Sequence, residues 1–183
     1  YGKTTASNAG LMTFNGLGSN GTTFTLSSGS YTSALAQNYN GLVALGANAT
    51  LTGSQVTTAS TVAGSASQYN LTVNGPLTTG GSMTSLGAVN VTGLATLGGS
   101  QVTSAGAQTY GGNVVLAGSG NTFLLSSALT GGANVGITGS LTATTATKAL
   151  TITAGTGDVS LAGAVGGAYA GREIEKQIRK ETR

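Results

Sequence analysis

The residue types that carry most enzyme chemistry are nearly absent from this chain. It has no histidine and no cysteine, so the commonest general base, the usual zinc ligands and the thiol nucleophile are all missing. Asp158 is the only carboxylate side chain before Glu173, and a single carboxylate cannot form the acid pair of a glycosidase. The many serines and threonines have no partner base to activate them. We therefore expect no catalytic residue, no metal site and no cofactor, and a protein that is not an enzyme.

Three tyrosines are the best candidates for a binding surface. Tyr39, Tyr69 and Tyr110 each follow a nearby glutamine and precede an apolar stretch. If they stack on one face, they form an aromatic row that can grip a glycan or a protein partner. The alternative is that they close the corners of the fold over small residues, which is the commoner use of isolated amphipathic aromatics.

Charge is almost confined to the end of the chain. Every residue from Thr4 to Thr147 is uncharged, whereas residues 172–183 carry five basic and three acidic side chains. The pI near 9.4 is thus largely a property of this tail, and the body offers no basic surface for nucleic acid. The longest apolar runs are too short for a transmembrane helix. We expect neither nucleic-acid binding nor a membrane span.

The charged tail, residues 168–183, has the pattern of a short amphipathic helix. Ile174 and Ile178 share one face at i, i+4, and Glu175 can pair with Arg179 at the same spacing. Such a short helix needs docking to be stable. It is interpreted as a cap over the last rung, as a contact between assembled subunits, or as a foreign segment; these alternatives stay open at this stage.

Similar short segments, which we call echoes, recur along the chain and indicate a repeat architecture. The phrase ATLTGSQVTTA at residues 49–59 returns as ATLGGSQVTSA at 95–105, and shorter echoes begin at Gln37 and Gln108 and at Thr23 and Thr122. The offsets of 46, 71 and 99 are close to two, three and four times a unit of roughly 23–25 residues, a length typical of stacked repeats.

Within the repeats, short strand-like runs alternate with Gly, Ser and Asn. Runs such as Leu71–Val73 and Leu150–Thr153 place aliphatic residues on one side and Thr on the other, which is the period of a half-buried strand. We predict an all-β parallel β-helix, or β-solenoid, of about six or seven coils of roughly 24 residues over residues 1–167. Val56 and Val102 occupy matching places in the repeated phrase, so we expect both inside the solenoid in equivalent settings.

Two long stretches carry a resemblance to a known family. Residues 98–116 (GGSQVTSAGAQTYGGNVVL) and 152–167 (ITAGTGDVSLAGAVGG) resemble the repeat units of filamentous-haemagglutinin-like exoproteins and related β-strand-repeat adhesins, which are exported by two-partner or autotransporter routes. The resemblance covers roughly residues 35–167. It implies a secreted, extracellular or cell-surface location, a right-handed β-helix, and a role in adhesion or as a stalk, and it supplies no catalytic residue.

Three classes of function remain. The first is a structural or adhesive segment of a secreted bacterial surface protein, whose partner is the surface or a glycan of a host or neighbouring cell. The second is a self-assembling extracellular filament or matrix subunit, whose partner is a copy of itself end to end. The third is an ice- or glycan-binding solenoid with a flat Thr face; residues 142–144 and 151–153 are fragments of such a face, but no regular array is visible in the sequence.

Overall fold

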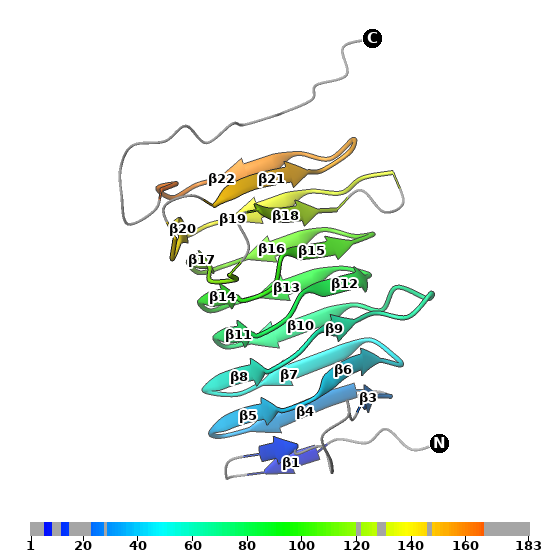
Figure 1. Ribbon diagram of the computed structural model, residues 1–183. Coiled ribbons are helices and arrows are strands. Elements are labelled where there is room, and N and C mark those ends of the chain that lie inside the picture. Colours follow the sequence, from blue (N-terminus) through cyan, green and yellow to red (C-terminus); the bar gives the residue numbers. More distant parts are fainter. Residues whose placement is uncertain are drawn as a thin grey trace.

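The chain winds into a stack of coils in which every strand is short and parallel to its neighbours (Figure 1). The computed structural model describes residues 6–8, 12–14, 23–27, 29–119, 122–127, 131–145 and 148–166. Successive strands of the chain visit three sheets in turn, so that each coil contributes one strand to each sheet. The prediction of an all-β parallel solenoid is confirmed.

Each sheet forms one side of the stack. Sheet A contains β1 (Ala6–Asn8), β4 (Gly29–Ser33), β7 (Ala49–Thr52), β10 (Leu71–Asn74), β13 (Val89–Val91), β16 (Gln108–Tyr110), β19 (Val135–Ile137) and β22 (Val159–Leu161). Sheet B contains β2 (Met12–Phe14), β5 (Ala36–Tyr39), β8 (Gln55–Thr58), β11 (Leu77–Thr79), β14 (Ala95–Leu97), β17 (Val114–Leu116) and β20 (Leu141–Ala143). Sheet C contains β3 (Thr23–Leu26), β6 (Leu42–Leu45), β9 (Val62–Ala63), β12 (Met83–Leu86), β15 (Gln101–Ser104), β18 (Thr122–Ser126) and β21 (Ala149–Thr153).

The alternation of side chains along each strand builds the core. In β10, Leu71 and Val73 are buried, Thr72 between them is half-buried and Asn74 is exposed. Strand pairing then places like residues above one another, as where Leu71 pairs with Val89 in the next coil. Apolar side chains therefore form continuous rows down the interior, because a parallel register stacks inward positions on inward positions.

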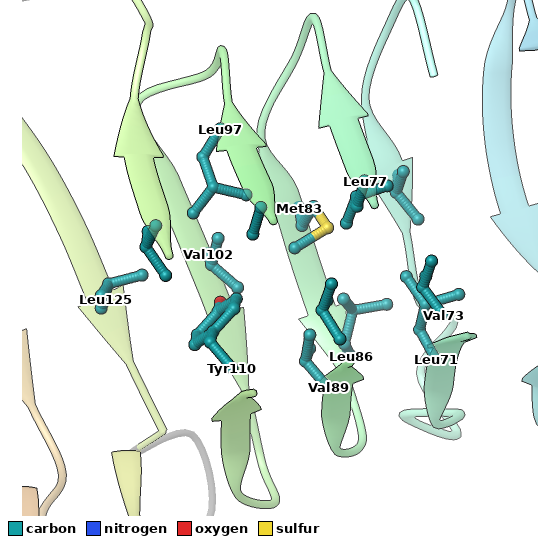
Figure 2. Packing of buried hydrophobic residues seen from close by; sticks show 14 of the residues in the cluster. Leu71, Val73, Leu77, Met83, Leu86, Val89, Leu97, Val102, Tyr110 and Leu125 are labelled. Carbon is teal, nitrogen blue, oxygen red and sulfur yellow. The ribbon is translucent and has the colours of Figure 1, made fainter. Parts of the chain in front are cut away.

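The interior is narrow and lined from all three sides. Figure 2 shows Leu77 of β11, Met83 of β12 and Val89 of β13 in the same interior, one residue from each of sheets B, C and A. Val56 and Val102 are 0 % and 1 % exposed, so the prediction that both lie inside is confirmed. The prediction that their settings are equivalent was wrong. Val56 lies in β8 of sheet B, whereas Val102 lies in β15 of sheet C.

The coils are less uniform than the sequence repeats suggest. Within sheet A, Leu71 pairs with Val89, whereas Gln108 pairs with Val135, which is a much longer step along the chain. Coil length therefore varies, and the predicted length describes the ends of the stack better than its centre, where the coils are shorter. The difference lies in the connections, because the strands themselves differ little in length.

The repeated phrase does not mark equivalent places in the fold. Its first copy, residues 49–59, runs through sheets A and B, and its second copy, residues 95–105, runs through sheets B and C. The offset between the copies thus corresponds to two full coils, from β7 to β13, plus the step from sheet A to sheet B, where β14 begins the second copy. By contrast, the echo at Thr23 and Thr122 does return to the same sheet, in β3 and β18, five strands apart.

A column of glycines runs down the corner between sheets A and B. A Cβ on Gly75, whose φ is +136°, would lie 2.2 Å from the carbonyl oxygen of Gly53 in the preceding coil. A Cβ on Gly93 would lie 2.7 Å from the backbone of Gly75 and Pro76. Only glycine allows the backbones of adjacent coils to approach this closely at a bend.

The charged tail cannot be compared with its prediction. Residues 168–183, with Ile174, Glu175, Ile178 and Arg179, lie outside the described residues. Its assignment as a helix, and its separation from the solenoid domain of residues 1–167, stay predictions.

Candidate contact face on sheet A

Short polar side chains form a regular array on the outer face of sheet A. We call it the polar array; it consists of an inner row and an outer row. The inner row is Ser30, Thr50, Thr72, Asn90 and Thr109, which are register partners from coil to coil. The outer row is Thr32, Thr52, Asn74 and Thr92, where Thr32, Thr52 and Asn74 are register partners and the Thr92 amide donates to the Val73 carbonyl at 3.0 Å.

Strand geometry fixes the spacing of the polar array. Neighbouring parallel strands lie about 4.8 Å apart, and residues two positions apart on one strand lie about 6.6 Å apart. Members of one row therefore repeat along the stack at the first spacing, and the two rows run side by side at the second. Thr50 and Thr52 of β7, for example, flank Leu51, which is 1 % exposed and anchors the strand in the core.

Hydrogen bonds within the polar array hold parts of it in place. The Asn74 amide donates to the Thr52 hydroxyl at 3.3 Å. The Thr92 hydroxyl accepts from the Gly75 amide at 3.0 Å. These bonds run between coils, so they restrict the rotamers of the outer row and keep its polar groups in a fixed order.

The chemistry of the polar array is limited to neutral hydrogen bonding. All nine members are hydroxyl or amide residues without charge, and four of them, Asn74, Asn90, Thr92 and Thr109, are exposed. Within the described residues no group of three or more His, Cys, Asp or Glu side chains is placed to hold a metal ion. Such a face can donate to and accept from hydroxyl-rich molecules, and its binding would depend little on salt.

The Thr fragments singled out in the sequence lie elsewhere. Thr142 belongs to β20 in sheet B, whereas Thr151 and Thr153 belong to β21 in sheet C. The sequence predicted no regular Thr array, and the array that spans the coils is a mixture of Ser, Thr and Asn. The polar array was missed because its members come from different sequence contexts and meet only through the register between coils.

Two of the three candidate tyrosines are interior residues. Tyr39 and Tyr110 are both 0 % exposed, and they belong to β5 in sheet B and β16 in sheet A. Tyr69 lies between strands, partly buried against the core. The three therefore do not form an exposed aromatic row, and the surface interpretation of Tyr39 and Tyr110 is corrected.

Each buried tyrosine is paired with the glutamine two residues before it. The hydroxyl of Tyr39 donates to Oε1 of Gln37 at 2.9 Å, and that of Tyr110 donates to Oε1 of Gln108 at 3.1 Å. Residues i and i+2 share one face of a strand, so both partners point inward together. Burial raises the pKa of Tyr110 above its ordinary value, and burial followed by the charge of Tyr31 does the same for the pKa of Tyr39.

The two glutamines also bind the backbone at the corners. Nε2 of Gln37 donates to the carbonyls of Tyr31 and Thr52, both at 2.7 Å. Nε2 of Gln108 donates to the Ser126 carbonyl at 2.8 Å and to the Ser104 hydroxyl at 3.1 Å. In both cases the amide joins the ends of two stacked strands. The repeated Gln-x-Tyr spacing in the sequence was the signal of this device, which satisfies buried polar groups.

Among the described residues no helix is long and apolar enough to cross a membrane.

Comparisons of the chain with protein-family models, with curated proteins and with solved structures found no match.

Proposed function

We propose that this β-solenoid is a structural and adhesive segment of a secreted bacterial cell-surface repeat protein, and that the polar array binds glycans of a host or neighbouring cell. The observation that carries the proposal is the inner row of neutral hydroxyl and amide groups over five consecutive strands of sheet A, with the shorter outer row beside it. Glycans present many hydroxyl groups at repeated intervals, and these match an extended row of fixed donors and acceptors.

The proposed role is non-enzymatic and depends on rigidity. Buried residues such as Leu51 of β7 and Val73 of β10 anchor their strands in the core. The outward side chains of these strands are therefore held in place before a partner binds. Little conformational entropy is then lost on binding, which favours affinity from individually weak hydrogen bonds. Weak contacts that recur along a rod also add up when the partner surface is itself repetitive.

Removing hydroxyls from the polar array tests the proposal. We expect the double variant Thr50→Val and Thr72→Val to bind glycans about tenfold more weakly, since each lost hydrogen bond costs about 0.5–1.5 kcal/mol. Valine keeps the shape and strand preference of threonine. Binding is measured on a glycan array and on intact cells.

The matched control removes the same groups from another side. Thr57 and Thr78 belong to the same two coils, face outward from sheet B and are also half-buried. The variant Thr57→Val and Thr78→Val should bind like the parent chain, and the binding of the parent should change little with salt. Equal loss in both double variants, or no glycan binding by the parent chain, would contradict the proposed contact face.

The same regularity favours a second candidate function, binding to ice. Two parallel rows of hydroxyl and amide groups at fixed spacing can hold an ordered layer of water. The test is arrest of ice growth by the parent chain and loss of that arrest when Thr72→Lys places a long charged side chain in the inner row. Growth that continues unchanged in the presence of the parent chain would eliminate this candidate.

A further inference from the structure

The C-terminal end of the stack exposes a layer of core residues. Leu150, Ile152, Val159 and Leu161 are only partly buried, and Val165 is 37 % exposed. Their register partners one coil earlier are buried; they are Phe123, Leu125, Val135, Ile137 and Leu141. The end layer therefore has the composition of the interior, and among the described residues no further coil covers it.

The opposite end of the stack continues the same inward rows. Phe24 of β3 begins the row of sheet C that ends at Ile152, and it is partly buried where it packs edge-on against Tyr39, with ring centroids 6.3 Å apart. In sheet A the inward row that ends at Leu161 begins at the register position of Ala6. A second copy placed on the end layer would thus bring Ala6 onto the row that ends at Leu161 and Phe24 onto the row that ends at Ile152.

The coils at the two ends have nearly equal length. Ala6 pairs with Tyr31 and Val135 pairs with Val159, and these two steps along the chain differ by a single position. In sheet A the described strands end at β1 and β22, and in sheet C they end at β3 and β21. In sheet B the edge of β20 is already occupied, because Leu141 forms a parallel bridge with Val165 and its amide donates to the Ala164 carbonyl at 2.8 Å. The edges of β22 and β21 are open to a further strand among the described residues, and unpaired strand edges favour pairing.

A row of side-chain acceptors points toward the C-terminal end. Each acceptor directly precedes a strand of sheet A and binds the backbone of the following coil: Asn48 Oδ1 accepts from the Asn70 amide at 2.9 Å, Asn70 Oδ1 from the Ala88 amide at 2.7 Å, and Asn134 Oδ1 from the Asp158 amide at 2.9 Å. Asp158 occupies the last place of this row in the described residues, and it is exposed. Its carboxylate can accept an amide N–H from the next strand in the same way.

The charges of the chain offer little repulsion to a second copy. Asp158 directly precedes β22 and is exposed. No like charge in residues 4–147 opposes the approach.

We propose that the C-terminal end layer binds the N-terminal coil of a second copy of this chain, so that the solenoid extends into a filament with sheet A continued from copy to copy. This contact is heterologous and does not close on itself, and such contacts generate open filaments. It goes beyond the glycan-binding role and does not depend on it, because the polar array lies on the side of the stack.

The experiment starts from the full chain of 183 residues. Sedimentation velocity over a range of concentrations and negative-stain images should show linear filaments of one solenoid width. Ile152→Asp places a charge in the end layer and should abolish them. Thr151→Asp places the same charge on the neighbouring, outward and exposed position of β21 and should leave them intact. Should Ile152→Asp fail to fold by circular dichroism, Asp158→Lys at its exposed site takes its place with the same expected loss.

Mixing two blocked variants tests the polarity of the contact. Phe24→Asp blocks the N-terminal end and Ile152→Asp the C-terminal end, so each should be monomeric alone. An equimolar mixture should form dimers and nothing longer, since only one pair of intact ends is present in each dimer. The mixture leaves glycan binding untouched, so its failure is distinguishable from failure of the contact face.

Three outcomes would overturn the proposal. The first is a parent chain that stays monomeric at high concentration. The second is a dimer of Phe24→Asp alone, which would mean that two C-terminal ends bind each other. The third is filaments that appear only after residues 168–183 are deleted, which would mean that the chain's own tail covers the end layer.

Discussion

The glycine column at the corner between sheets A and B gives the sharpest test of how the coils are packed. Replacing Gly93 by Ala places a Cβ 2.7 Å from the backbone carbon of Gly75 and the nitrogen of Pro76, whereas ordinary contacts begin at 3.4 Å. The two coils would have to separate by roughly 0.7 Å at this corner, the difference between these two distances. Both sides of the contact are backbone, so no side chain can rotate away.

The separation has a cost that follows from the structure. The Gly93 amide donates to the Gly75 carbonyl at 3.2 Å, and a further 0.7 Å or so would break this hydrogen bond. Loss of one hydrogen bond, at about 0.5–1.5 kcal/mol, adds to overpacking, at about 1–3 kcal/mol. We expect Gly93→Ala to lower the free energy of unfolding by about 2–4 kcal/mol, and to lower the melting temperature by about 5–15 °C.

Gly136 is the matched control. A Cβ at Gly136 meets nothing within 4 Å, so Gly136→Ala should be neutral or stabilise the fold by about 0.4–1 kcal/mol through the unfolded chain. Thermal melting and urea unfolding, both followed by circular dichroism, compare the two variants with the parent. If Gly93→Ala and Gly136→Ala melt at the same temperature, the close approach of the coils at this corner is wrong.

Two further predictions concern the interior. Val102→Asp should destabilise the fold by about 3 kcal/mol or more, because it buries an unpaired carboxylate, while Thr103→Asp on the half-buried outer side of β15 should have a much smaller effect; equal melting of the two in thermal scans would contradict the inward position of Val102. Tyr39 and Tyr110 have raised pKa values in the folded chain, so the unfolded state loses their protons first and stability should fall as pH rises above about 10, the ordinary pKa of tyrosine. A spectrophotometric titration should then show these two phenols ionising together with unfolding, and their independent ionisation in a folded chain would refute their burial.

The class of fold could be predicted because its signal is local. Alternation such as Leu71-Thr72-Val73, with Gly and Asn between the runs, is sufficient to indicate short half-buried strands. Echoes in the sequence then indicate that these strands belong to stacked repeats. Both inferences need only the neighbours of each residue along the chain, and the structure confirms them.

The phase of the coils could not be predicted, for a physical reason. All three sides of the stack are built from the same local pattern, an inward apolar residue between outward polar ones. The same repeated segment can therefore form parts of sheets A and B at residues 49–59 and parts of sheets B and C at residues 95–105. The length of a coil depends on its connections, which vary without changing the strands. Sequence similarity therefore did not report structural equivalence, and a coil length inferred from the offsets between echoes could not follow the variation from coil to coil.

The sequence by itself determined that the body is an all-β stack with very few charges and with neither histidine nor cysteine. Only the tertiary structure decided which side chains meet. Tyr39 and Tyr110 point inward because they share a strand face with Gln37 and Gln108, whose amides bind the corner backbone. The polar array and the end layer exist only where separate coils come into register, and that register is set by hydrogen bonds between segments that are distant along the chain, which no local pattern encodes.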